Sequence, residues 1–373
     1  MTGSAPLEKL ARIPAAIAAA ADYESYGRER VTAQAWAYMT GGAADELTVR
    51  DNEAAFARLA LHTRVLRDLS GANTALELLG CALPFPILLA PVAYHRLVHP
   101  DGEMATVLGA SAMGAGLVVS TQASVLLEDI ARAAAAPLWF QLYIQHDREF
   151  TVDLARRAEA AGYRALVVTV DAPVTALRNR EQRAGFAMPP GIEAVNLRGM
   201  RPAPAQSGAA GGPVLLGGPL LAAAPTWDDL AWLRSKTRLP ILLKGIMGAA
   251  DAVRAVDAGM DGVIVSNHGG RILDGQPATI DVLPGIAEAV GGRVPLLLDG
   301  GIRRGADAFK ALALGAKAVL VGRPYVWGLA AAGATGVSHV LHMLRAELEV
   351  TMALTGCRDL SAITPDLVSP RPR

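Results

Sequence analysis

The feature that most constrains the fold of this chain is a recurring pattern of short apolar runs, each followed by an alanine-rich segment of helical length. Runs this uniformly apolar are typical of a parallel sheet that is buried on both faces. Closing eight such strands on themselves gives a (β/α)8 barrel, also called a TIM barrel, and this is the α/β fold that we predict. The runs are Ile87 to Ala90, Leu117 to Ser120, Leu138 to Leu142, Ala165 to Thr169, Ile241 to Lys244, Gly262 to Ser266, Pro295 to Asp299 and Ala318 to Gly322.

The spacing of these runs divides the chain into regions. Successive runs begin roughly 20 to 30 residues apart, the length of one βα unit, except between the fourth and fifth. That longer interval, residues 189–224, is dense in glycine, proline and alanine, which is typical of a lid or a disordered loop. Residues 1–70 show helical periodicity instead of the strand pattern. We predict an N-terminal helical cap over residues 1–70 and one barrel over residues 71–373, with a lid loop over residues 189–224.

Charge and cysteine content exclude several classes of function. The chain of 373 residues carries 35 acidic and 35 basic residues, so it has no net field to attract nucleic acid or an anionic membrane. Its two cysteines, Cys81 and Cys357, have no metal-ligand spacing and cannot make a disulfide scaffold. We predict a cytoplasmic enzyme that acts on a small molecule and uses no nucleic acid, membrane or metal.

The N-terminal region contains an alanine-rich run, Ile13 to Ala21, that follows Lys9 and Arg12 and loosely resembles a secretory signal. Alanine is only weakly apolar, and Pro14 interrupts the run. No window of the chain holds the ~20 strongly apolar residues that a membrane span needs. We therefore predict an N-terminal helix here.

Polar side chains concentrate where the predicted strands end, which is the end of a barrel at which active sites lie. The sixth strand leads into the sequence Ser266-Asn267-His268-Gly269-Gly270-Arg271. Histidine can accept a proton near neutral pH, and arginine offers a planar fork of donors that fits a carboxylate. The combination suits a small acid that loses hydrogen at carbon. A loop with a capping histidine and a surface arginine would have the same sequence.

The seventh and eighth strands end in glycine-rich turns. Gly300 and Gly301 precede Arg303, and Gly322 precedes Arg323. Barrel enzymes commonly bind phosphate at these two loops, through backbone amides and nearby positive charge. The simpler alternative is that the glycines only make tight turns. We predict a phosphorylated ligand.

Residues at the ends of the third, fourth and fifth predicted strands indicate which phosphorylated ligand binds. Lys244 ends the fifth strand, where it could form a Schiff base or act as a fixed cation. A cation can stabilise the negative charge of a reduced flavin. Gln141 and Thr169 are neutral donors and acceptors that suit a ring with mixed polar edges. Together these residues point to FMN lying across the mouth of the barrel.

The motifs as a set resemble the FMN-dependent α-hydroxy-acid oxidases and dehydrogenases, the family that includes glycolate oxidase, lactate oxidase and mandelate dehydrogenase. The resemblance covers nearly the whole chain. At Val92-Ala93-Tyr94 the chain looks most like the mandelate and 4-hydroxymandelate oxidase branch of the family. The matching motifs are Ala90-Pro91-Val92-Ala93, His99-Pro100-Asp101-Gly102-Glu103, Gln141-Leu142-Tyr143, Thr169-Val170-Asp171, Leu243-Lys244-Gly245, Ser266 to Arg271, Asp299-Gly300-Gly301-Ile302-Arg303 and Gly322-Arg323-Pro324.

The resemblance implies a role for each matching residue. For catalysis it implies His268 as the base and Asp171 as the carboxylate that holds it, together with Tyr143 and Arg271. For the substrate it implies Tyr38, Tyr143, Arg178, His268 and Arg271, with both arginines on the substrate carboxylate. For FMN it implies Ala93, Ser120, Gln141, Thr169, Lys244, Ser266, Asp299, Gly301, Arg303, Gly322 and Arg323. Two departures, Gln122 and Leu177, replace residues usual in glycolate oxidases, so we predict an aromatic acid of the mandelate type.

The function that the resemblance implies is oxidation of an (S)-2-hydroxy acid to the 2-oxo acid, with oxygen reduced to hydrogen peroxide, by a homo-oligomer that is a tetramer. Alternatives within the family are an oxidase of lactate or glycolate and a dehydrogenase that passes electrons to a quinone or a protein. A phosphosugar aldolase or isomerase on the same fold would use Lys244 as a Schiff base. A flavin-binding sensor without catalysis would need neither both arginines nor the base.

Overall fold

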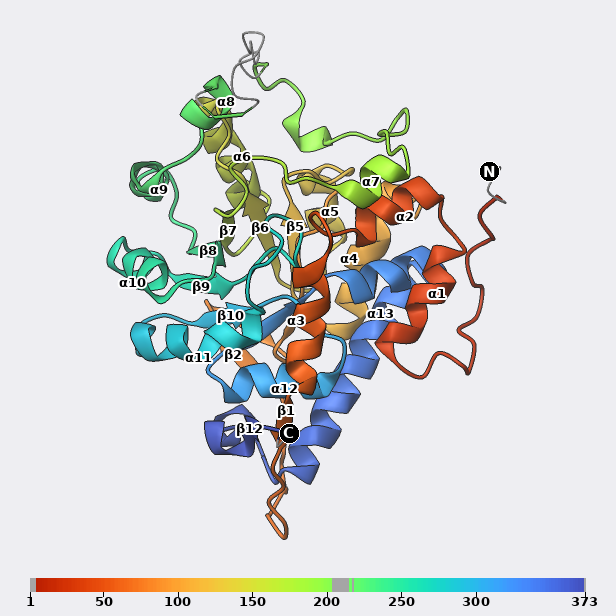
Figure 1. The fold of residues 1–373 in the computed structure, drawn as a ribbon, viewed down its shortest axis with the longest axis vertical. Coiled ribbons are helices and arrows are strands. Elements are labelled where there is room, and N and C mark those ends of the chain that lie inside the picture. The colour runs from red at the N-terminus through yellow and green to blue at the C-terminus, as the bar shows by residue number, and fades with distance from the viewer. Residues whose placement is uncertain (1–4, 203–214, 217, 372–373) are drawn as a thin grey trace.

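The computed structural model describes residues 5–202, 215–216 and 218–371 (Figure 1). Eight parallel strands close into a barrel in the order β10-β11-β4-β5-β6-β7-β8-β9, and each falls on one of the eight apolar runs. The predicted (β/α)8 barrel is therefore confirmed. The strands are β4 (Ile87–Leu89), β5 (Leu117–Ser120), β6 (Leu138–Leu142), β7 (Leu166–Thr169), β8 (Ile241–Ile246), β9 (Gly262–Val265), β10 (Leu296–Leu298) and β11 (Ala318–Val321).

Helices follow the strands and cover the outside of the barrel (Figure 1). Their starts are set locally, as in α6, where the Asp147 carboxylate accepts a hydrogen bond from the Phe150 N–H at 3.2 Å. The helices are α4 (Glu103–Met113), α5 (Leu127–Ala133), α6 (Arg148–Ala160), α7 (Asn179–Arg183), α8 (Pro219–Ala222), α9 (Trp227–Arg234), α10 (Ala249–Asp257), α11 (Thr279–Val290), α12 (Gly305–Ala313) and α13 (Arg323–Leu354). Short 3-10 turns lie at Ala20–Asp22, His95–Leu97, Val195–Leu197, Leu360–Ala362 and Pro365–Leu367.

The apolar strands separate two hydrophobic cores. Successive side chains of a strand point to opposite faces, so Leu88 packs inside the barrel while Ile87 and Leu89 pack outward against the helices. The inner core contains residues from all eight strands, among them Trp139 of β6, and the outer core is the larger of the two. Burial on both faces explains why these strands carry no polar alternation. The polar residues are left to the strand ends.

The segment before the barrel forms three helices, α1 (Tyr23–Arg28), α2 (Ala33–Thr40) and α3 (Leu47–Ala57). It ends in β1 (Leu59–Leu61), which pairs antiparallel with β12 (Val368–Pro370), so residues from the two ends of the chain lie side by side. A β-hairpin, β2 (Leu76–Leu78) with β3 (Cys81–Leu83), precedes β4. None of the helices in the described residues combines the length and apolar character needed to cross a bilayer.

The predicted helix over Ile13 to Ala21 is wrong. Residues 13–19 form turns, and regular helix begins only with the 3-10 turn Ala20–Asp22 and α1. The Asp22 carboxylate accepts hydrogen bonds from the Ala18 and Ala19 N–H groups at 2.9 and 2.8 Å. These bonds cap the chain where the Ala20–Asp22 turn begins, so the alanines before it do not enter a helix.

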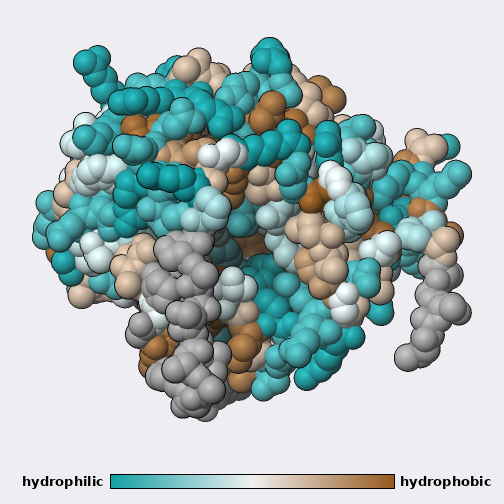
Figure 2. All heavy atoms as spheres, turned by 90° about the horizontal axis from the view of Figure 1, so that it is seen from above, coloured by the Kyte–Doolittle hydropathy of each residue, from teal (hydrophilic) through white to brown (hydrophobic). Residues whose placement is uncertain are grey.

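The first part of the long connection after β7 carries α7. This helix lies beside α2 (Figure 1), where the Gln34 side chain donates to the Gly185 carbonyl at 3.2 Å and the Ala44 N–H donates to the Leu177 carbonyl at 2.9 Å. Figure 2 views the molecule from above Figure 1 and shows a largely hydrophilic face. Of the predicted lid loop over residues 189–224, positions 203–214 and 217 lie outside the described residues.

Candidate active site

The predicted site residues meet at the carboxyl ends of the barrel strands. β7 ends at Thr169 and leads to Asp171, while β9 ends at Val265 and leads to His268. The two side chains are 97 residues apart in sequence, yet His268 Nδ1 lies 2.9 Å from Asp171 Oδ1. Parallel strands present these ends at one edge of the sheet, so the contact follows from the topology.

The backbone around this pair is shaped to bring the two groups together. His268 has a left-handed φ of 57°, and its N–H donates to Ser266 Oγ at 3.0 Å. Left-handed backbone is uncommon for a residue with a Cβ and is found often at functional sites. Gly245, with φ of 108°, packs against the carboxylate so closely that a Cβ there would lie 2.5 Å from Asp171 Cβ. Glycine after Lys244 therefore makes room for Asp171.

Electrostatics favour a neutral imidazole beside an ionised carboxylate. Burial lowers the pKa of His268, and the positive charge of Lys244 lowers it further. The negative charge of Asp171 raises this pKa, but the net shift is downward. Burial raises the pKa of Asp171, but the charge and hydrogen bond of His268, with the charge of Lys244, outweigh burial and lower that pKa overall. A neutral histidine oriented by a carboxylate can serve as a general base.

The residues predicted to bind substrate gather next to this pair. The Arg271 guanidinium lies 5.6 Å from the centre of the Tyr38 ring. Burial raises the pKa of Tyr38 to about 12, and burial together with the Asp171 charge raises the pKa of Tyr143 still further. Both phenols therefore keep their protons in the neutral range and can donate hydrogen bonds. The charges of Arg178 and Arg271 act on both tyrosines, which places all four residues in one cluster.

The sequence interpretation missed Glu181, which sits inside this cluster. Its Oε1 accepts a hydrogen bond from Arg178 Nη1 at 3.0 Å and lies 3.6 Å from Arg271 Nη2. The only signal in the sequence is that Glu181 lies three residues after Arg178, a spacing at which side chains on a helix meet. Nothing in the sequence places it next to Arg271.

A second missed contact fixes the loop that carries His268. Asn52 of α3 and Asn267 exchange side-chain hydrogen bonds at 2.8 and 2.9 Å, and both residues are buried. Asp274 adds to this support because its carboxylate accepts from the Thr48 N–H at 2.8 Å, at the start of α3. The helical segment before the barrel is thus tied to the loop after β9.

The residues predicted to hold the flavin ring form two hydrogen-bonded chains. Ser120 Oγ donates to Gln141 Oε1 at 3.3 Å, and Gln141 Nε2 donates to Thr169 Oγ1 at 3.1 Å. On the next strands, Lys244 Nζ donates to Ser266 Oγ at 2.9 Å and lies 3.1 Å from Asp299 Oδ2. The strand register makes Ser120 the neighbour of Gln141 and Thr169 the neighbour of Lys244. The ends of the five adjacent strands β5 to β9 thus present one layer of polar side chains above the apolar core. Asp299, which follows the neighbouring strand β10, extends this layer through its contact with Lys244.

The predicted phosphate residues are present at the ends of β10 and β11 but have protein partners. Arg303 forms an ion pair with Glu53 and lies 5.0 Å from the centre of the Trp327 ring. Arg323 is partly buried and donates to the carbonyls of Thr40, Gly269 and Gly41, at 3.0, 2.8 and 3.2 Å. A Cβ on Gly301 would lie 2.1 Å from the Asn52 carbonyl oxygen, so close packing of α3 already requires that glycine.

The geometry of the residues predicted to hold FMN leaves polar atoms and backbone free for such a ligand. Asp299 Oδ1 and Asp171 Oδ2 are buried without a hydrogen-bond partner among the described residues. A Cβ on Gly322 would meet only Ala90 Cβ, at 3.9 Å, so the backbone there stays open to a ligand. Ala93, in the loop after β4, is partly exposed at the same end of the barrel. A polar floor with a cation at one side and arginines at the other suits a flavin ring with a phosphate tail.

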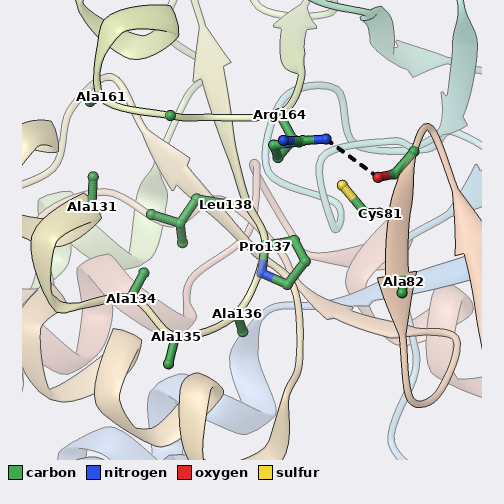
Figure 3. A pocket seen from close by; sticks show the side chains of 12 residues that line it. Cys81, Ala82, Ala131, Ala134, Ala135, Ala136, Pro137, Leu138, Ala161 and Arg164 are labelled. Carbon is green, nitrogen blue, oxygen red and sulfur yellow. Dashed lines mark hydrogen bonds between the residues drawn. The ribbon is translucent and has the colours of Figure 1, made fainter.

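A cavity of about 430 Å³ lies at the opposite end of the barrel (Figure 3). Small side chains line it, including Ala82, Ala131 and Ala161, and Arg164 donates to the Gly80 carbonyl at 3.5 Å. The strands begin at this end, whereas the active sites of such barrels lie at the end where the strands finish. This cavity holds no acid or base that could act in place of His268. In the described residues, no cluster of three or more His, Cys, Asp or Glu side chains could hold a metal ion.

The fold and the site define a protein of the (β/α)8 class with a layer of polar side chains at the strand ends. The family model of the FMN-dependent dehydrogenases matches residues 27–370. The chain belongs to this family, and FMN is its cofactor.

Individual relatives match nearly end to end. The chain is 51% identical to a protein named L-lactate oxidase from Alicycliphilus denitrificans, over 96% of this chain and 98% of that protein. It is 43% identical to 2-hydroxyacid oxidase 1 of Homo sapiens, over 94% and 96% of the two chains. The solved structure of a mandelate oxidase with benzoyl-formic acid superposes with a TM-score of 0.85 at 40% identity, covering 95% of this chain and 98% of that one.

Proposed function

We propose that this enzyme oxidises an (S)-2-hydroxy acid to the 2-oxo acid and passes the electrons to oxygen, giving hydrogen peroxide. The observation that carries the proposal is the His268–Asp171 pair, 2.9 Å apart, beside the partly buried guanidiniums of Arg178 and Arg271. A base next to a two-arginine carboxylate site matches an acid that loses hydrogen at the carbon beside its carboxylate. Relatives named as oxidases of lactate and of 2-hydroxy acids support the same chemistry.

Each residue of the cluster has a distinct task in this proposal. Arg178 and Arg271 bind the substrate carboxylate, and the Tyr38 and Tyr143 hydroxyls donate hydrogen bonds to the substrate. His268 takes one substrate proton on Nε2, because Nδ1 is held by Asp171. Asp171 then stabilises the imidazolium that results. Bound FMN would supply the acceptor for the two electrons and for the second proton that leave the substrate.

The FMN residues are proposed from the polar layer. Lys244 places positive charge beside Ser266 and Asp299 at the end of β8, and Gln141 offers both a donor and an acceptor toward the ring. The proposal gives the FMN phosphate to Arg303, Arg323 and the backbone at Gly322, and a phosphate there would compete with Glu53 for Arg303. A Schiff-base enzyme is less well supported, because Lys244 is engaged by Ser266 and Asp299, and His268 would have no task.

An aromatic substrate is the finer part of the proposal. Tyr38 stacks on Phe186 with ring centres 4.7 Å apart and meets Tyr94 edge-on at 6.0 Å, next to Arg271. Such a wall can bury a phenyl ring at roughly 25 cal/mol per Å² of apolar area. The 40% identity to a mandelate oxidase supports this reading, whereas the 51% identity to a lactate oxidase supports a small aliphatic acid.

A comparison of mandelate with lactate and glycolate tests the substrate class. If the aromatic wall binds a ring, kcat/KM for (S)-mandelate should exceed that for (S)-lactate by more than tenfold, since even one fitted methylene is worth ~1–3 kcal/mol. Peroxide formation at air-saturating oxygen measures both the substrate preference and the electron acceptor. A higher kcat/KM for lactate or glycolate would overturn the aromatic part, and substrate oxidation without peroxide would overturn the acceptor.

A further inference from the structure

Glu181 occupies the place that the proposed function gives to the substrate carboxylate. A single oxygen, Oε1, accepts from Arg178 Nη1 at 3.0 Å and lies 3.6 Å from Arg271 Nη2. The side chains of Arg178, Arg271 and Glu181 are only 14%, 18% and 15% exposed. The three groups therefore interact with little screening by water, and the interaction is stronger than that of a surface ion pair.

The helix that carries Glu181 is held over the site by its neighbours. Arg180, one residue earlier, forms an ion pair with Glu46 and donates to Thr40 Oγ1 at 3.3 Å. The backbone on either side of α7 is bonded to α2 and to the loop that follows it, as described above. These contacts tether the Glu181 carboxylate between Arg178, which precedes α7, and Arg271, which lies in the loop after β9.

Charge balance shows what this arrangement does to an incoming acid. Two guanidiniums and one carboxylate leave a single net positive charge. Arg178 Nε is buried without a hydrogen-bond partner among the described residues, so donor capacity is left over in the cluster. A tethered group acts at an effective concentration in the millimolar range, and a free acid has to compete against it. The Glu181 charge also offsets the repulsion between Arg178 and Arg271.

We propose that Glu181 is an internal carboxylate that competes with the carboxylate of the substrate for Arg178 and Arg271, and so sets how tightly the enzyme binds its acid. This inference rests on the proposed role of the two arginines. An incoming acid displaces Glu181 from the guanidiniums, and departure of the product lets Glu181 return. Glu181 is thus a specificity-determining residue that weakens ground-state binding without touching the reacting carbon.

If Glu181 instead served to align the two arginines, removing its charge would change the affinity for an acid in the opposite direction. If the carboxylate only aligned the guanidiniums, its loss would let them splay apart, and acid binding would weaken. Competition predicts the reverse, because its loss frees both donors for the ligand. The direction of the change in affinity therefore separates the two roles.

The test is a calorimetric titration of FMN-loaded protein with pyruvate, comparing wild type with Glu181→Gln, which keeps the shape and removes the charge. We expect pyruvate to bind at least about tenfold more tightly to the variant, equivalent to about 1.4 kcal/mol. Glu193→Gln is the matched control, because Glu193 pairs with Arg198 on the same connection but is exposed, and its pyruvate affinity should not change. Equal or weaker binding to Glu181→Gln would overturn the proposal.

A second variant guards against misfolding of the first. Glu181→Asp keeps the charge but withdraws it by one methylene, so its affinity for pyruvate should fall between those of wild type and Glu181→Gln. An affinity equal to or below that of wild type would contradict competition. The titration needs no turnover, so it is independent of the oxidase activity. If the enzyme oxidises 2-hydroxy acids but Glu181→Gln does not bind pyruvate more tightly, the role of Glu181 is wrong and the proposed function is unaffected.

Discussion

The pKa values of His268 and Arg271 bound the pH range over which the proposed site works. Burial lowers the pKa of His268 from 6.5, so the imidazole is already neutral above that value and is protonated only as pH falls below it. Burial, with the Arg178 charge, lowers the pKa of Arg271 to about 10. The guanidinium therefore begins to lose its proton as pH approaches that value.

A pH profile of kcat/KM checks both shifts. We expect a plateau from about pH 7 to 9, an acid limb whose midpoint lies below 6.5, and an alkaline limb near pH 10 that reflects loss of carboxylate binding. The profile should be recorded with an acid that is fully ionised throughout. An acid midpoint above 6.5 would contradict the burial of a neutral base.

The shape of the Arg271 side chain should matter as well as its charge. Arg271→Lys keeps a cation but loses the planar fork that holds a carboxylate at two points. A hydrogen bond to a charged group is worth ~1.5–3 kcal/mol, so binding of a 2-oxo acid should weaken by roughly tenfold to a hundredfold. Flavin spectral titration measures this, with Arg198→Lys as the control, because Arg198 is exposed and pairs with the exposed Glu193. Unchanged affinity in Arg271→Lys would remove Arg271 from the carboxylate site.

For single residues, the sequence predicts which side chains lie at the candidate site better than it predicts which groups they contact. His268 and Asp171 could be paired from sequence because both follow apolar strands, and strand ends converge in a barrel. Glu181 and Asn52 could not, because their contacts depend on how α7 and α3 dock. Arg323 was predicted as a phosphate ligand, but its bonds to three carbonyls are invisible in sequence, since every residue carries a carbonyl.

Among the elements, α13 depends most on glycine. The helix bends at Ala332 and Gly333, where φ of 58° at Gly333 is unfavourable for any residue with a Cβ. Its two halves then touch, so that a Cβ on Gly336 would lie 1.9 Å from the Gly328 carbonyl oxygen. The close approach lets α13 pack against both α4 and α1.

Gly336→Ala should therefore destabilise the protein. The added methyl has no space beside backbone, and forced overpacking costs about 3 kcal/mol in the free energy of unfolding. Denaturant titration measures the loss, and Thr335→Ala on the exposed side of the same helix serves as the control. Equal stability of the two variants would mean that the halves of α13 do not touch as described.

The strands could be predicted from sequence because each is a continuous apolar run, whereas some boundaries could not. β8 continues past Lys244 to Ile246 through a register shift, which places Gly245 against Asp171. That extension follows from a contact with another strand end and has no local signal. The failure at Ile13 to Ala21 has a local cause instead, because the Asp22 carboxylate, three and four residues after Ala19 and Ala18, overrides the helix propensity of alanine.

For the whole molecule, the two hydrophobic cores position the chemistry. Side chains inside the barrel pack below the polar layer, and helices outside hold the strand ends in register. The division into a cap and a barrel, the tetramer and the cytoplasmic location stay predictions. Light scattering of the FMN-loaded protein should give four times the chain mass of 38.8 kDa, and the mass of a single chain would contradict the tetramer.

The most direct test of the account is anaerobic flavin reduction in the purified, FMN-loaded protein. Mixing wild type with excess (S)-2-hydroxy acid should bleach the flavin absorption band, with the two electrons of the substrate retained in the protein. His268→Asn should bind FMN as wild type does but bleach about 10²- to 10⁴-fold more slowly, the usual contribution of a general base. A wild-type flavin that no 2-hydroxy acid bleaches, or a His268→Asn protein reduced at the wild-type rate, would contradict the account.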